Sequence, residues 1–172
     1  MSTLPSSLAA NFEVRHLSVP LHQPYNQARA HFNELVPVLD QARFEQLKSG
    51  EAVVEQVRIN APHHFMRYWE GDVTAAMTGS GSAWKCTSYL MGNHVIAERM
   101  YRRDPVAMLY APLRVVIHED RTGSARFELD QPSTLFASRR DPEITGVGPE
   151  LDGYVAALLT ALGAGVPAEL ES

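Results

Sequence analysis

Residues 113–130 read LRVVIHEDRTGSARFELD, two runs of alternating apolar and polar residues on either side of a turn. Such alternation is typical of β-strands, because successive side chains of a strand point to opposite faces of the sheet. The apolar positions are Leu113, Val115 and Ile117 in the first run and Ala125, Phe127 and Leu129 in the second. The turn sequence Asp120–Gly123 favours a hairpin. We therefore predict two antiparallel strands with one apolar face under helices and one polar face in water.

Three other segments have the periodicity of amphipathic helices. In the last one, apolar residues recur at helical spacing from Leu151 to Leu162, with Pro149 suited to the first helical position and Gly163 to the residue beyond the end. A middle helix starts after Asn93, a good N-cap, and stops before Pro105. The first helix spans about 24–39, where Pro37 must kink or end it.

Further strands are expected at 12–21 and 82–91, while 51–59 fits a strand or a helix and 64–69 resembles a strand. The resulting order, β-α-(insert)-β-α-β-β-α, indicates an α+β fold: a mainly antiparallel sheet with helices packed on one face. A helix between two strands also suggests one parallel pair. We expect a single domain over 12–165 with an irregular insert at 41–81, and flexible tails at 1–11 and 166–172.

Composition narrows the class of protein. The 172 residues suit one domain, and 45% of them are hydrophobic, as in ordinary globular proteins. The net charge of -5 and the lack of a Lys/Arg-rich block argue against nucleic-acid binding. The single cysteine excludes an internal disulfide and a cysteine-based zinc site. Without a signal-like start or a membrane-length apolar run, the chain is expected in the cytoplasm, away from membranes.

The run Tyr89–Asn93 (YLMGN) is followed by the middle helix, by MLYAPLR at 108–114, by VVIHED at 115–120 and by DQPS at 130–133. This succession resembles the bacterial family called domain of unknown function 302. The resemblance covers about 82–162, and 12–39 fits the family's opening strand and helix. It implies a compact, dimeric α+β fold and no established activity.

Gly92, Asn93 and His94 stand at the predicted junction between a strand and a helix. Gly92 would let the backbone approach a ligand, and the free N–H groups of the first helical turn would bind an anion beside His94. The simpler interpretation is an N-cap, with Gly92 supplying an awkward backbone angle. With Arg114, these residues are the candidate ligand-binding set.

Acid–base chemistry has its candidates in Tyr110, His118 and Glu128, with Asn93 and His94 positioning the substrate. For this to hold, at least two of the candidates must converge in one pocket. The alternative for His118 and Glu128 is charge pairing across the hairpin on a solvated or subunit-facing surface.

The seven histidines show no spacing typical of a metal site, and adjacent His63 and His64 would point to opposite faces of a strand. No phosphate-binding or dinucleotide motif is present, so no cofactor is expected. No metal is expected either, and the alternative is a site that the scattered histidines assemble in space. Three functions stay open: binding of a small apolar or anionic molecule between sheet and helices, acid–base catalysis of the isomerase, lyase or cyclase type, and a structural or interaction role. We also expect a homodimer, because a hairpin 113–130 at a sheet edge would need shielding and its mixed charges (Arg114, Arg126, Glu119, Glu128 and Asp130) suit a two-fold contact. The alternative is a monomer whose sheet edge is covered by 41–81.

Overall fold

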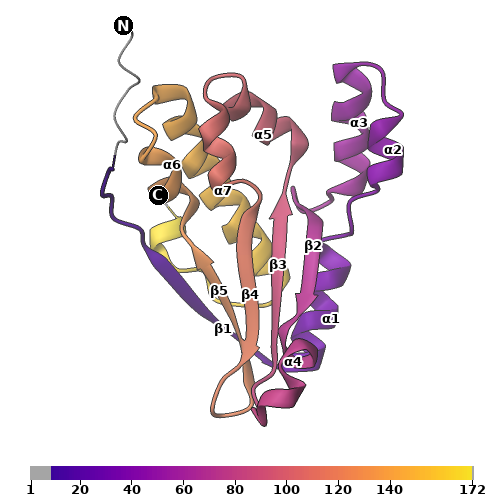
Figure 1. Ribbon diagram of the computed structural model, residues 1–172, viewed down its shortest axis with the longest axis vertical. Helices are drawn as coiled ribbons and strands as arrows, with labels where there is room; N and C mark the ends of the chain where they lie inside the picture. Colours follow the sequence, from indigo (N-terminus) through magenta and orange to yellow (C-terminus); the bar gives the residue numbers. More distant parts are fainter. Residues whose placement is uncertain (1–8, 172) are drawn as a thin grey trace, which may run out of the picture.

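Five antiparallel strands form one sheet in the computed structural model, which describes residues 9–171 (Figure 1). The strands are β1 (His16–Pro24), β2 (Met66–Asp72), β3 (Cys86–Gly92), β4 (Leu113–Glu119) and β5 (Ser124–Asp130). They lie in the order β1-β5-β4-β3-β2, so the hairpin β4–β5 is inside the sheet and not at its edge. Every pair of neighbouring strands is antiparallel.

Helices pack on one face of this sheet, and α1 and α7 lie behind it in Figure 1. The helices are α1 (Tyr25–Leu35), α2 (Gln41–Glu45), α3 (Gly50–Asn60), α4 (Val73–Ala76), α5 (His94–Tyr101), α6 (Pro132–Ala137) and α7 (Pro142–Ala161). Short 3-10 turns occur at η1 (Thr78–Ser80), η2 (Pro105–Leu109) and η3 (Ala168–Leu170). The predicted α+β class and the one-sided helix layer are confirmed.

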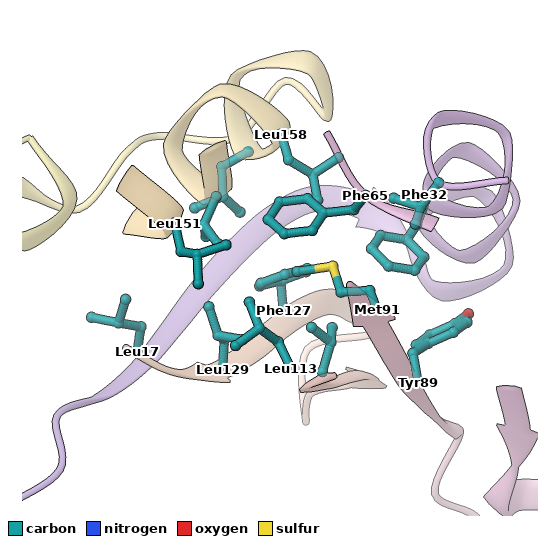
Figure 2. Packing of buried hydrophobic residues seen from close by; sticks show 14 of the residues in the cluster. Leu17, Phe32, Phe65, Tyr89, Met91, Leu113, Phe127, Leu129, Leu151 and Leu158 are labelled. Atoms are coloured by element: carbon teal, nitrogen blue, oxygen red, sulfur yellow. The ribbon is translucent and has the colours of Figure 1, made fainter. Parts of the chain in front are cut away.

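The core forms where the alternating faces of β4 and β5 meet α7. All six apolar positions predicted from residues 113–130 are at most 3% exposed. Figure 2 shows Leu151 and Leu158 of α7 directed toward Leu113, Phe127 and Leu129 of the sheet. Each buried Leu, Val, Ile or Phe side chain contributes roughly 1.5–3 kcal/mol by leaving water, so burial of this face stabilises the fold.

Helix α7 begins at Pro142, which makes the predicted start at Pro149 wrong. Asp141 caps the helix by accepting hydrogen bonds from the Glu143 and Ile144 N–H groups, and Pro149 lies inside it. The additional turns bury Ile144 and Val147, and this packing offsets the backbone hydrogen bond that Pro149 cannot make. The predicted end is confirmed, since Gly163 has a φ of 76°.

The segment 41–81 is regular, and the expectation of an irregular insert is wrong. It contains α2, α3 and the edge strand β2, around a small second core of Val57, Ala61 and Met66. Residues 51–59 are helical. The expectation of a parallel pair of strands is also wrong, because no two strands within 9–171 pair in parallel. After α1, Val38 makes one isolated parallel bridge to Arg67, and the chain then passes through α2 and α3 before it forms the edge strand β2.

The two chain ends differ from the expected tails. Most of the N-terminal tail, 1–8, lies outside the described residues, and β1 starts at His16 rather than at residue 12. At the other end, Leu170 is 3% exposed and the Gln131 side chain donates a 2.8 Å hydrogen bond to the Glu169 carbonyl. Residues 166–171 are therefore packed on the domain, because Leu170 completes the core beside α7.

Candidate functional site

A groove of about 340 Å³ opens between α5, α6 and the ends of β3 and β4. Its walls are largely apolar and include Phe65, Met100, Tyr101, Met108, Phe136 and Leu151. Phe65 and Leu151 are core residues (Figure 2), so the floor of the groove is the core itself. Gly92, Asn93 and His94, predicted as ligand-binding residues, all line it.

Asn93 is the N-cap of α5. Its Oδ1 accepts hydrogen bonds from the N–H groups of Val95 (3.0 Å) and Ile96 (3.3 Å), and its Nδ2 donates to the His64 carbonyl (2.9 Å). The side chain therefore occupies first-turn amides that an anion would need. This geometry favours the capping interpretation of Asn93 over the anion-binding one.

Gly92 lies in a tightly packed position. A Cβ at this position would lie 3.3 Å from the Tyr68 ring and 3.4 Å from Pro112. The glycine thus lets Tyr68, from the edge strand β2, lie against the end of β3.

His94 is held by two aromatic residues, Phe44 and Tyr68, whose contact with it sequence reasoning did not predict. The Tyr68 hydroxyl is 2.6 Å from His94 Nδ1, and the rings of Phe44 and Tyr68 stack on the imidazole at centroid distances of 4.7 and 5.3 Å. Burial lowers the pKa of His94 below its usual 6.5 and raises the pKa of Tyr68. At neutral pH the pair is therefore an uncharged imidazole beside a protonated phenol.

Arg114 and Tyr110 line a neighbouring cavity of about 470 Å³, which shares the wall Met108 and Ala111–Leu113 with the groove. The Tyr110 ring packs edge-on against Phe136, at a centroid distance of 6.2 Å. Asp130 also lines this cavity. The structure thus separates Arg114 from the other three predicted ligand-binding residues.

His118 and Glu128 meet on the polar face of the sheet, 2.9 Å apart, and neither lines the groove. Glu128 also accepts hydrogen bonds from Ser18 (2.7 Å) and contacts His16 (2.8 Å). Burial alone would raise the pKa of Glu128, but these hydrogen bonds together lower it. His118 and Glu128 thus form a cross-strand pair, and none of the cavities described above holds them together with Tyr110.

Comparison with known families adds an assignment. A family model described as domain of unknown function DUF302 matches residues 43–162. The chain belongs to the DUF302 family. The match starts inside the segment expected to be an insert, so the DUF302 domain includes α3 and β2 as well as the motifs at 82–162.

A solved structure supports the same fold for this DUF302 protein. The crystal structure of an uncharacterized conserved protein DUF302 from Bacillus stearothermophilus has a TM-score of 0.63 to this chain. The two share 15% identity over 86% of this chain and 97% of that one. No curated protein matches the chain.

Two further findings concern the part of this DUF302 protein from residue 9 to 171. No three His, Cys, Asp or Glu side chains there are grouped so that they could hold a metal ion. Nor does that part contain a helix with the length and apolar character needed to span a membrane.

Proposed function

We propose that this protein binds a small, apolar, uncharged molecule in the groove beside α5. The observation that carries the proposal is the groove itself, about 340 Å³ in volume and walled largely by aromatic, methionine and leucine side chains. Ligand sites of small molecules are typically concave and apolar with a few placed polar groups. Here those groups are Asn93, His94, Glu98 and the Tyr68 hydroxyl.

Three observations favour an uncharged ligand over an anionic one. Asn93 already occupies the Val95 and Ile96 amides at the start of α5. His94 is half-buried and its pKa is lowered by desolvation, which favours the neutral imidazole, and Glu98 places a carboxylate along the same groove. An anion there would be desolvated without a cation to offset the cost.

Acid–base catalysis by Tyr110, His118 and Glu128 has less support. The hypothesis needs at least two of them in one pocket, and His118 and Glu128 pair on the polar face of the sheet instead. Their geometry fits cross-strand pairing, and we do not extend the proposal to catalysis by these residues.

The test is binding of phenylnaphthylamine, a neutral probe that fluoresces in apolar sites. Ala97 lines the groove and is half-buried, so Ala97→Phe fills the space and should weaken the probe at least about tenfold, or about 1.4 kcal/mol. The matched control is Ala157→Phe, at an exposed position of α7 outside the groove lining, which should bind as the unmodified protein does. Equal affinity of the two variants, or no binding by the unmodified protein, contradicts the proposal.

A further inference from the structure

Two of the polar groups of the groove, His94 and Tyr68, form a hydrogen-bonded neutral pair. Both side chains line the groove, and their Nδ1 and hydroxyl oxygen are 2.6 Å apart. His94 follows the N-cap Asn93 on α5, whereas Tyr68 comes from β2, so the pair joins two elements that the cap and the sheet hold in place.

We assign the imidazole tautomer from this pairing. The Tyr68 hydroxyl has no other hydrogen-bond acceptor within residues 9–171, so it is assigned as the donor to His94 Nδ1. A neutral imidazole has one N–H, and with Nδ1 accepting, that proton sits on Nε2. In the part of the chain that the structure describes, no hydrogen bond uses His94 Nε2. His94, which lines the groove, therefore carries one N–H, on Nε2, that no described residue uses.

The surroundings keep this donor fixed in direction. The Phe44 ring stacks on the imidazole at an interplanar angle of 18°, and Tyr68 does so at 22°. The ring cannot rotate without breaking both stacks and the hydrogen bond. A preorganised donor of this kind contributes to selectivity because little of its freedom is lost on binding.

Resting on the proposed function, we propose that His94 selects ligands that carry an uncharged oxygen acceptor, such as a ketone, ester or amide carbonyl, on an aromatic body. Nε2–H donates to that oxygen, while the rings and thioethers of Phe65, Met100, Tyr101, Met108 and Phe136 hold the aromatic part. A carboxylate ligand is disfavoured by Glu98 and by the missing positive charge on His94.

The experiment measures displacement of phenylnaphthylamine by three matched compounds at neutral pH: naphthalene, acetylnaphthalene and naphthoate. In the unmodified protein, acetylnaphthalene should bind roughly threefold to tenfold more tightly than naphthalene, the value of one hydrogen bond. Naphthoate should bind more weakly than naphthalene.

Variants assign the preference to His94. His94→Phe keeps an aromatic ring without a donor, so the ratio of the naphthalene and acetylnaphthalene Kd values should fall to about one. His94→Gln restores an N–H donor and should recover part of the ratio, and Tyr68→Phe, which frees the tautomer, should lower it partly. His31→Phe, on α1 outside the groove lining, should leave the ratio unchanged.

The outcomes separate the two proposals. If phenylnaphthylamine does not bind, or Ala97→Phe does not weaken it, the proposed function fails, and the role of His94 fails with it. If the probe binds as expected but acetylnaphthalene shows no advantage over naphthalene, or His94→Phe keeps that advantage, the role of His94 is overturned while the apolar site stands. If His94→Phe does not fold, the other two variants decide. The donor assignment is overturned if Tyr68→Phe leaves the ratio of the naphthalene and acetylnaphthalene Kd values unchanged and His94→Gln lowers that ratio to about one.

Discussion

Gly148 lies on the face of α7 that packs against α6. A Cβ at this position would be 2.6 Å from the Ser133 Cα, a contact with backbone that cannot give way cheaply. One turn later, the buried Asp152 accepts hydrogen bonds from the Ser133 N–H (3.0 Å) and from Gln131 Nε2 (2.6 Å), which fixes α6 in place. We expect Gly148→Ala to lower the free energy of unfolding by about 1–3 kcal/mol, the usual cost of overpacking.

Gly146 is the matched control on the same helix, because a Cβ there meets nothing within 4 Å. Gly146→Ala should raise the free energy of unfolding by roughly 0.5–1 kcal/mol, since alanine loses less backbone entropy in a helix. Urea denaturation of both variants measures the difference. If both changes raise the free energy of unfolding to the same extent, the inference that α7 packs tightly against α6 at Gly148 is wrong.

Single residues also show where sequence reasoning stops. Gly92, Asn93 and His94 could be found because a cap and a glycine at a strand-to-helix junction are local signals. The partnership of Tyr68 with His94 could not be found, because the two residues are 26 positions apart and meet only through the pairing of β2 with β3. That pairing includes an irregularity between Arg67 and Trp69, which no local pattern encodes.

At the scale of an element, the start of α5 depends on Asn93. Asn93→Ala removes the acceptor for two N–H groups and the donor to the His64 carbonyl, at a position only 9% exposed. We expect a loss of about 1–2 kcal/mol in the free energy of unfolding, as for other N-caps. Asn93→Ser keeps a capping oxygen and should lose less. Equal losses in the two variants, measured by urea denaturation, would show that the cap itself contributes nothing.

The elements divide into those with a local signature and those without one. The hairpin β4–β5 was predictable in detail because the alternation of apolar and polar residues, interrupted only at Val116, and the turn at Asp120–Gly123 determine its register. The start of α7 was misplaced because Pro142 and Pro149 both suit the first position of a helix. The structure identifies Pro142 as the start, since the Asp141 side chain before it accepts a hydrogen bond from the Ile144 N–H. The strand predicted at 64–69 is found as β2, Met66–Asp72, and its bounds were misplaced because a bulge between Arg67 and Trp69 interrupts the pattern of this edge strand.

At the scale of the whole molecule, helices cover one face of the sheet and the opposite face stays polar. The register places Trp69, Leu90 and Arg114 in one row across that face, and Val116, Glu128 and Ser18 in the next. The hairpin β4–β5 is inside the sheet, so its backbone groups do not need the shielding by a second copy that was expected at an edge. The edge strand β2 is partly paired instead, because the Arg67 N–H and carbonyl bond to Pro37 and Leu39.

We propose that two copies of the chain associate through this polar face. It carries Arg114 and Arg126 together with Glu128 and Asp130, a mixture that can pair with itself across a two-fold axis. Trp69, half exposed at the end of one row, is the residue type that contributes most at interfaces. The net charge of -5 is screened beyond about 8 Å at physiological salt and does not prevent association.

Light scattering during size-exclusion chromatography should give a mass near twice the 19.0 kDa of one chain at roughly tens of micromolar protein. Trp69→Ala should shift the mass toward one chain, because it removes the apolar anchor from the face. Trp84→Ala is the matched control: Trp84 is exposed to a similar extent, 56% against 51%, but precedes β3 and lies outside the two rows. A mass near 19.0 kDa for the unmodified protein, or dissociation by Trp84→Ala alone, would rule out a dimer formed through this face.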